Sequence, residues 1–417
     1  MKLFTRVLGF CLAVSLVALG NGLPTAPAES LGLSKERLAR ITRTMEADVA
    51  AARIPGALAM VIRNGKVAYV EARGFADREK SQPMKLDTIF RIYSMSKPIT
   101  SVAVMMLYEE GKLRLQDPVS KFIPEFADAQ VLVENGDGTG KLEKPRRAMT
   151  VQDLLRHTSG LTYGFFARSK VDEQYLKVGI LRLDKDLAEM TTKLAKIPLK
   201  HQPGTRWEYS VSTDVLGRIV EVAGGMRLDE FFQKRIFDPL KMTDTGFFVP
   251  DSKRARFAQL YAPETGGKIK PADPAQSARF LDPKATFFSG GGGLMSTAGD
   301  YARFCQMLLN GGQLDGVRLL GRKTVDYMAS NHLAGTSQAQ LPGGRGFGLG
   351  FAVIEEPSLT GVASSKGEYS WGGMAGTRFW IDPAEKLIGI YMIQISPHTG
   401  LNYGETFKVL TYQALVE

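Results

Sequence analysis

The pattern of hydrophobic and polar positions begins with one helix and one hairpin. Between Ser34 and Arg53, apolar residues recur at helical spacing, and Ser34 is a residue type that caps helix N-termini. Two β-rich runs, 57–63 and 66–72, follow, and Asn64-Gly65 joins them as a typical two-residue hairpin turn. The pattern therefore predicts a helix followed by the start of an antiparallel sheet.

The next two hundred residues have a mainly helical pattern. A helix is predicted from Ser94 to about Gly111, and Thr150 begins a sequence typical of a capped helix start. Another apolar helical stretch runs from Val215 to Val222. Residues 253–284 are rich in Ala, Pro and Arg, so we expect an extended loop there.

Strand patterns return near the C-terminus at 348–354, 377–381 and 387–395, and a helical pattern follows at 406–416. The sheet is therefore expected to combine both ends of the chain, with a terminal helix from each end covering one face. We predict an α/β (α+β) fold in which an antiparallel sheet, flanked by terminal helices, adjoins a mostly α-helical second lobe across a cleft. The sheet lobe takes about 29–93 and 290–417, and the helical lobe about 94–289.

The N-terminus has the pattern of an export signal. Lys2 and Arg6 precede an apolar run from Val7 to Leu19, and small residues ending at Ala28 provide a cleavage site. The run is shorter than the roughly 20 residues that span a bilayer, so cleavage is expected rather than a permanent anchor. Residues 1–28 are thus predicted as a signal peptide, residues 29–417 as the exported domain, and the periplasm or the extracellular space as its location.

The chain is basic, with a formal net charge of +10, but its Lys and Arg residues are scattered. This distribution is typical of a solvated surface, or of loose attraction to an anionic envelope, and not of a nucleic-acid-binding face. We expect no nucleic-acid partner and no stable membrane span after processing. Only Cys305 remains after cleavage, and no tract has the His or Cys spacing of a metal site, so neither a disulfide nor a metal or other cofactor is expected.

Ser94 and Lys97 form the first candidate for chemistry. They lie three residues apart at a predicted helix start, so their side chains share one helix face. The positive end of the helix dipole disfavours an ammonium group there and makes a neutral amine more accessible. A neutral amine beside a hydroxyl is a general base, although a Ser-x-x-Lys string also occurs by chance.

Tyr209 and the segment from Trp371 to Met374 form two further candidates. Close to Lys97, the Tyr209 phenol would favour its anionic form and could relay a proton, whereas the alternative is a tyrosine that packs in the core. Trp371-Gly372-Gly373-Met374 leads into a predicted strand, and its glycines allow a ligand to approach the backbone. An N–H from this edge, together with the Ser94 amide, would form an oxyanion hole. The alternative is a bend at a sheet corner.

The remaining polar and aromatic residues have competing interpretations. A Ser-His-Asp triad would need one of four histidines, but the chain lacks Gly-x-Ser-x-Gly, and His157 lies in a turn-like sequence. Asp214 could approach Lys97 or Tyr209, although a solvated helix position is the commoner role. We expect Gly290–Gly293 to be a flexible turn, not a phosphate loop. An aromatic group either walls an acyl pocket or packs in the core: Tyr163, Phe165 and Phe166. The other three histidines are His201, His332 and His398.

Taken in order, Ser-x-x-Lys, the tyrosine and Trp-Gly-Gly resemble the three motifs of the serine β-lactamase and D,D-peptidase superfamily. Of its branches, the chain most resembles the family VIII carboxylesterases, which are built like class C β-lactamases. The resemblance extends over nearly the whole mature chain and includes residues 155–161, 236–240 and 291–294. It implies that Ser94 is the nucleophile, that Lys97 and Tyr209 are the base and the proton relay, and that the amides of Ser94 and Met374 form the oxyanion hole.

Two departures from the class C pattern concern the substrate. Val211 stands where Tyr-x-Asn has its asparagine, and Trp371-Gly372-Gly373 replaces Lys-Thr-Gly, which removes a cation and a hydroxyl that would hold a substrate carboxylate. Val211, Trp371, Gly372 and Gly373 are the predicted substrate-binding residues, and both departures indicate uncharged esters. The expected function is hydrolysis of short- to medium-chain esters through an acyl-Ser94 intermediate, with β-lactams such as cephalosporins compatible as side substrates.

Three alternatives retain the same fold. The first is a β-lactamase or D,D-peptidase that uses the same serine, and the second is an acyltransferase or amidase. The third is a non-catalytic penicillin-binding envelope protein, against which the presence of Ser94, Lys97 and Tyr209 argues. The residues leave open whether Lys97 or Tyr209 is the acylation base.

Overall fold

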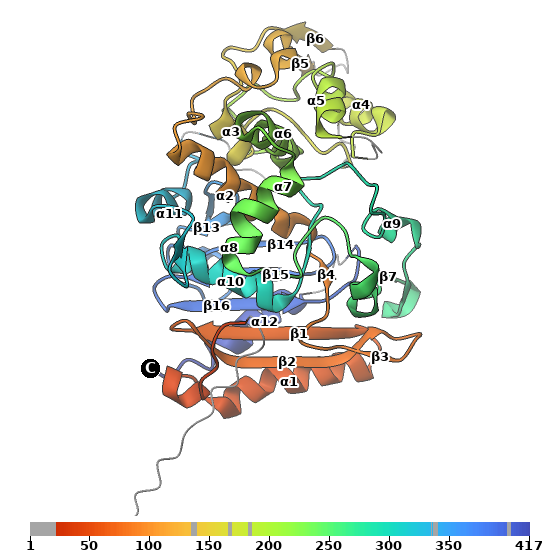
Figure 1. Ribbon diagram of the computed structural model, residues 1–417, viewed down its shortest axis with the longest axis vertical. Helices are drawn as coiled ribbons and strands as arrows, with labels where there is room; N and C mark the ends of the chain where they lie inside the picture. Colours follow the sequence, from red (N-terminus) through yellow and green to blue (C-terminus); the bar gives the residue numbers. More distant parts are fainter. Residues whose placement is uncertain are drawn as a thin grey trace, which may run out of the picture.

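The computed structural model describes residues 22–134, 140–165, 169–181, 186–334, 336, 341–397 and 402–417. It has a sheet lobe and a helical lobe, stacked along the long axis of the molecule (Figure 1). This mixed α/β architecture with a large antiparallel sheet confirms the predicted fold class. The predicted apolar run 7–19, Phe166 and His398 lie outside the described residues.

One eight-stranded antiparallel sheet, in the order β12-β13-β14-β15-β16-β1-β2-β3, forms the centre of the first lobe. The N-terminal strands join the C-terminal strands where β1 pairs with β16, so the two ends of the chain build one sheet as predicted. The β1–β2 hairpin turns at Asn64-Gly65, both with positive φ. The strands are β1 Gly56–Arg63, β2 Lys66–Asp77, β3 Gln82–Pro83, β12 Arg345–Phe347, β13 Ala352–Ile354, β14 Tyr369–Gly372, β15 Arg378–Asp382 and β16 Leu387–Met392.

Helices α1 (Lys35–Ala50) and α12 (Tyr403–Tyr412) cover the face of the sheet that is turned away from the helical lobe. The Ser34 side chain caps α1 by accepting a hydrogen bond from the Arg37 N–H at 3.2 Å. The two helices bury one side of the sheet in a hydrophobic cluster that includes Ile41, Trp380 and Phe407. Each end of the chain thus contributes a helix to the same layer.

Helix α2 (Ser96–Glu109) runs between the two lobes, and every residue from Ser96 to Leu107 is buried. The helix is therefore enclosed on all sides, including at its polar residues Ser96, Lys97, Thr100 and Ser101. The Thr150 capping box with Asp153 is present at the start of α3. The other α-helices are α3 Val151–Leu155, α4 Lys170–Val178, α5 Leu187–Leu194, α6 Ser212–Gly224, α7 Leu228–Phe232, α8 Asp238–Leu240, α9 Ala275–Ala278, α10 Ala298–Leu309 and α11 Arg322–Met328.

Four short two-stranded pairings complete the strands. They are β4 Phe90–Arg91 with β9 Met295–Ser296, β5 Val131–Glu134 with β6 Gly140–Glu143, β7 Tyr261–Pro263 with β8 Ile269–Pro271, and β10 Gln313–Leu314 with β11 Val317–Arg318.

The prediction of an extended loop at 253–284 was wrong. This segment contains the β7–β8 hairpin and α9, and it buries Leu260, Tyr261 and Phe280. Its apolar residues follow no single period because they face different neighbours across a hairpin and one helical turn. The predicted strand 348–354 is also shorter than expected, because Gly350, at φ 107°, turns the chain just before β13.

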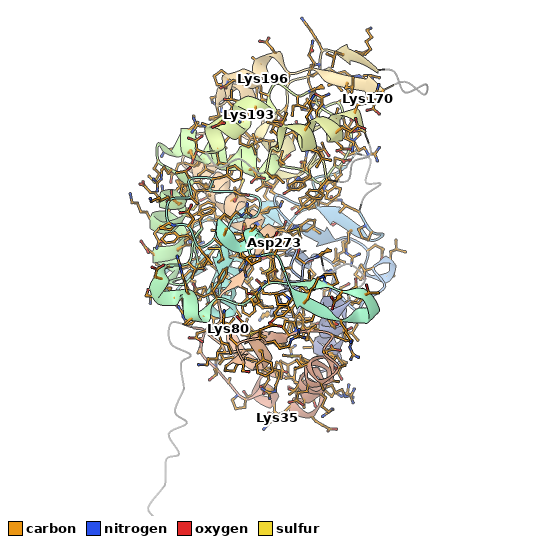
Figure 2. All side chains as sticks on the ribbon, turned by 90° about the vertical axis from the view of Figure 1, so that its right-hand side faces the viewer. Lys35, Lys80, Lys170, Lys193, Lys196 and Asp273 are labelled. Carbon is orange, nitrogen blue, oxygen red and sulfur yellow. The ribbon has the colours of Figure 1, made fainter. Side chains whose placement is uncertain are left out.

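Positive charge is spread over the molecule. Figure 2 shows Lys170, Lys193 and Lys196 on the helical lobe, whereas Lys35 lies at the opposite end of the molecule. In the part of the chain that the structure describes, no helix is both long enough and apolar enough to cross a bilayer.

Candidate active site

Ser94 lies in the 3₁₀ turn Tyr93–Met95 (η2), immediately before α2. Tyr93 has a φ of 41°, a left-handed conformation that is uncommon for a bulky side chain and that is found at functional turns. Surrounding contacts hold this turn, because the Tyr301 hydroxyl donates to the Met95 carbonyl at 2.9 Å and the Tyr93 ring packs edge-on against Phe280. The turn presents Ser94 to a cavity of about 890 Å³.

The structure brings Ser94, Lys97 and Tyr209 together. Lys97 Nζ donates to Ser94 Oγ at 3.0 Å, and the Tyr209 hydroxyl donates to the same Oγ at 2.7 Å. Lys97 is fully buried, and its Nζ lies 4.7 Å from the centre of the Tyr209 ring. The two hydrogen-bond distances to Ser94 Oγ are short enough for direct proton transfer to or from the serine.

A glycine loop holds Lys97 from the other side. Lys97 Nζ donates to the carbonyl of Gly291 at 2.6 Å, and the Gly291 N–H donates to Asp214 Oδ1 at 3.1 Å. The Ser289 hydroxyl donates to the same carboxylate oxygen at 2.5 Å. Asp214, on α6, is thus connected to the lysine through a single residue, Gly291.

These contacts correct two predictions. Asp214 is buried rather than solvated, and the 290–293 segment is packed against α6 rather than being a flexible turn. A Cβ added at Gly291 would lie 2.5 Å from Asp214 Oδ2, so only glycine allows this approach. The signal available in the sequence was the glycine run itself, since glycines also occur where two segments must lie close together.

Trp371 contacts the catalytic candidates through its indole nitrogen. Trp371 Nε1 donates to the Tyr209 hydroxyl oxygen at 3.2 Å, and the two rings lie 5.3 Å apart. Trp371 belongs to β14, whereas Tyr209 precedes α6 in the helical lobe. The indole therefore links the sheet to the tyrosine.

His157 supports Tyr209 and does not contact Ser94. Its ring centre lies 5.0 Å from that of Tyr209, and its Nδ1 lies 3.2 Å from the Ser210 hydroxyl. Burial holds the pKa of His157 well below its usual value, and the charge of Lys97 lowers that pKa further. The imidazole is therefore neutral at physiological pH and acts as a packed, hydrogen-bonded part of the core.

The other described histidines also lie apart from the serine. His201 Nε2 lies 3.3 Å from a Glu208 carboxylate oxygen, and His332 Nε2 lies 2.8 Å from the Tyr327 carbonyl. Over the described ranges, then, no histidine is hydrogen-bonded to Ser94. A Ser-His-Asp arrangement is not formed by these residues.

The predicted substrate-binding residues divide into two groups. Trp371, Gly372, Gly373 and Met374 all line the cavity with Ser94, and Met374 is 50% exposed. Gly373 lets β14 approach the nucleophile turn, because a Cβ there would lie 2.4 Å from the Ile92 carbonyl oxygen. Val211 is fully buried in the hydrophobic core and is not among the residues that line the cavity.

Aromatic side chains of the helical lobe complete the cavity wall. Tyr163 and Phe165 both line it, and their rings stack at 4.8 Å. Burial raises the pKa of the Tyr163 phenol well above its usual value, so this second tyrosine is neutral. Among the residues whose placement is described, no cluster of three His, Cys, Asp or Glu side chains could hold a metal ion.

Comparisons with known proteins agree on one family. A family model described as Beta-lactamase matches residues 41–411. Protein Rv1367c of Mycobacterium tuberculosis is 36% identical over 353 residues, which cover 82% of this chain and 86% of that protein. Esterase EstB of Burkholderia gladioli is 33% identical over 363 residues, covering 83% and 87%. The solved structure of EstCE1, a hydrolase with promiscuous acyltransferase activity, matches with a TM-score of 0.77 and 28% identity over 90% of this chain and 99% of EstCE1.

Proposed function

Because the chain belongs to the beta-lactamase family and is a serine hydrolase of the esterase type, we propose that it is a family VIII carboxylesterase that uses Ser94, Lys97 and Tyr209. Its reaction is the hydrolysis of short- to medium-chain esters through an acyl-Ser94 intermediate. One observation carries this proposal: the Ser94 hydroxyl receives hydrogen bonds from both Lys97 Nζ and the Tyr209 hydroxyl at the wall of a large cavity.

Acylation proceeds by attack of Ser94 Oγ on the ester carbonyl carbon. The hydroxyl proton passes to whichever of Lys97 and Tyr209 is deprotonated, and the same pair returns a proton to the departing alcohol oxygen. The amides of Ser94 and Met374 are the proposed donors to the oxyanion of the tetrahedral intermediate. Water then attacks the acyl carbonyl carbon and loses a proton to the pair. The pair returns a proton to Ser94 Oγ as the C–Oγ bond breaks, which releases the carboxylic acid and restores the serine hydroxyl.

Trp371 has two roles in this proposal. Its N–H donates to the Tyr209 oxygen, so it stabilises the phenolate that forms when Tyr209 gives up its proton. Its ring, with those of Tyr163 and Phe165, provides an apolar wall for the acyl chain. Trp371 carries no charge beside Ser94, which favours an uncharged group at that point over the carboxylate of a β-lactam. Cephalosporins and other β-lactams are therefore proposed only as side substrates.

The experiment is to label the serine and measure turnover in parallel. Intact-mass spectrometry after brief exposure to p-nitrophenyl butyrate should show one butyryl adduct, mapped to the peptide with Ser94. Ser94→Ala should show neither adduct nor turnover. Ser101→Ala is the matched control, because this buried hydroxyl lies one turn after Lys97 and has no hydrogen-bond partner in the described structure. Turnover retained by Ser94→Ala would refute the assignment, as would wild-type hydrolysis of penicillins faster than of esters.

Acyl transfer is the second candidate function, and the likeness to EstCE1 favours it. An acyl-Ser94 intermediate in an apolar cavity would react with an alcohol that competes with water. Adding an alcohol acceptor during p-nitrophenyl butyrate turnover should then give a new ester alongside butyric acid.

Export to the periplasm or the extracellular space remains part of the proposal. Fractionation of cells that produce the protein tests it, because an exported enzyme is found outside the cytoplasmic fraction.

A further inference from the structure

The active-site cavity extends past Ser94 around an unpaired stretch of β14. Strand β14 pairs with β13 only at Tyr369 and Ser370, so Trp371 and Gly372 have no strand partner on that side. Among the residues that line the cavity, Trp371 packs against Tyr209 in the helical lobe, whereas Arg378 and Gly404 belong to β15 and α12. The lining of the cavity therefore extends from Ser94 to residues of β15 and α12.

Arg378 lines this part of the cavity and is an exposed residue. It pairs with Gly372 across the β14–β15 ladder, and its side chain lies against both Gly372 and Gly404. A Cβ added at Gly404 would lie 2.2 Å from Arg378 Cδ and 2.7 Å from Nε, and one at Gly372 would lie 3.3 Å from Cγ. The Arg378 side chain occupies space that a side chain at Gly372 or Gly404 would otherwise fill. The two glycines therefore allow the arginine side chain to lie along the backbone of β14 and α12.

A second arginine, Arg345 at the start of β12, lines the same cavity. Burial lowers the pKa of Arg378, the Glu405 carboxylate opposes this effect, and the positive charge of Arg345 lowers the pKa further. Neither guanidinium has an ion pair or hydrogen bond with any residue that the structure describes. Lys408 and Glu368 form an ion pair at 2.6 Å. The other charged residues that line the cavity are Arg279, Asp214, Arg345, Arg378 and Glu405, so arginines outnumber carboxylates among them.

We propose that the enzyme acts on esters that also carry a carboxylate, with Arg345 and Arg378 as the residues that bind it. A carboxylate between the two guanidinium groups accepts bidentate hydrogen bonds and relieves their repulsion. The ester lies at Ser94 beside Trp371, and the apolar part of the substrate crosses the β14 edge. This inference rests on the proposed esterase function and narrows its substrate class. It also changes the expectation of uncharged esters, because the cation absent from position 371 is supplied by other strands.

The test compares matched esters that differ only in charge. One arm uses p-nitrophenyl monoesters of dicarboxylic acids with two, four or six methylenes against p-nitrophenyl alkanoates of equal length. The other arm places the carboxylate on the leaving alcohol, as 4-carboxyphenyl butyrate against phenyl butyrate. In at least one arm, the wild type should prefer the charged ester by about tenfold in kcat/KM, mainly through KM.

Variants then locate the binding residues. Arg345→Gln and Arg378→Gln should each remove most of that preference, because they raise KM for the charged ester more than KM for the neutral ester. Arg378→Lys should restore part of the preference. Lys366→Gln, which changes the same net charge at an exposed residue outside the cavity, should keep it. Thermal unfolding of each variant shows whether the fold is retained.

A binding measurement separates this inference from the esterase assignment. Calorimetry with adipate and the Ser94→Ala protein should show binding that the Arg345→Gln/Arg378→Gln double variant loses. If no ester is hydrolysed, the esterase proposal fails. The adipate measurement then still tests whether Arg345 and Arg378 bind a carboxylate. The inference is overturned if adipate does not bind, if no charged ester is preferred in either arm, or if the double variant keeps the preference.

Discussion

The indole N–H of Trp371 donates to the hydroxyl oxygen of Tyr209 at 3.2 Å, and Tyr209 donates in turn to Ser94 Oγ at 2.7 Å. A residue of the sheet is therefore connected to Ser94 through a residue of the helical lobe. At the position where the resembling class C enzymes have the lysine of Lys-Thr-Gly, this chain has a neutral donor. In the proposed mechanism, that donor would stabilise negative charge on the Tyr209 oxygen without placing a cation at position 371.

Trp371→Phe tests this relationship, because phenylalanine keeps an aromatic wall but lacks the N–H. Loss of one hydrogen bond of about 1 kcal/mol corresponds to a fall in kcat of about fivefold. KM for p-nitrophenyl butyrate should change little, since the apolar wall remains. Steady-state kinetics separates the two constants, with Trp207→Phe as the control, since the indole nitrogen of Trp207 has no hydrogen-bond partner in the described structure. An unchanged kcat in Trp371→Phe would mean that the indole only shapes the cavity.

Removing either proton-carrying side chain should have a larger effect. Lys97→Ala and Tyr209→Phe should each lower turnover by about two to four orders of magnitude, because both groups hydrogen-bond to the reacting oxygen. The double variant should be little worse than the worse single variant, since the pair works as a unit. Additive losses would indicate two independent roles.

Asp214 should matter for kcat although it does not contact Ser94. Asp214→Ala removes the acceptor that holds the Ser289 hydroxyl and the Gly291 N–H, so the Gly291 carbonyl is no longer fixed against Lys97. We expect kcat to fall about tenfold or more with KM nearly unchanged, as for a positioning residue. Asp214→Asn, which retains a carbonyl acceptor, should recover part of the loss. A lower melting temperature with unchanged kcat would assign Asp214 to stability alone.

Asp300 predicts a pH dependence of stability. Burial raises the pKa of this carboxyl to about 6 in the folded protein, where it accepts from the Asp244 N–H at 2.7 Å and the Thr245 hydroxyl at 2.9 Å. The folded state therefore binds this proton more tightly than the unfolded state, whose aspartate titrates near 4. The stability that this proton contributes is fully present below about pH 4 and is lost as pH rises through about 6.

The measurement is urea unfolding of the wild type and Asp300→Asn at several pH values from 4 to 7. The free energy of unfolding of the wild type relative to the variant should fall by an amount on the order of 3 kcal/mol over that range. A flat or rising difference would show that the carboxylate, not the acid, is the stabilised form.

The proposed signal-peptide cleavage gives another test. Leu23 is buried. The segment that follows it makes two backbone hydrogen bonds with Val67: the Val67 N–H donates to the Pro24 carbonyl at 2.8 Å, and the Ala26 N–H donates to the Val67 carbonyl at 3.1 Å. Cleavage after Ala28 would remove these contacts from the edge of β2, so the packing favours cleavage before Leu23. If the chain is exported as proposed, the mass of the processed product distinguishes the two sites. A mature chain that begins at Glu29 would support the boundary predicted from the small residues.

Some elements were predictable because their causes are local. Ser34 caps α1, Asn64-Gly65 turns the first hairpin and Thr150 begins α3, each through contacts within a few residues. The 253–284 segment could not be predicted in this way, because its order comes from burial of Leu260 and Phe280 against distant elements.

The sequence by itself determined the pairing of Ser94 with Lys97, because one helical turn brings residues three apart onto one face. The resemblance of the sequence motifs to those of a known family also identified Tyr209 and Trp371 as candidate site residues. Only the tertiary structure decided that Asp214 and the Gly291 carbonyl hold the lysine, that Val211 is buried in the core, and that Arg345 and Arg378 face the substrate cavity. The physical reason is that these roles depend on which segments pack together across the two lobes. Those segments are far apart in the sequence, so the spacing of residues within one segment does not show that they will be in contact.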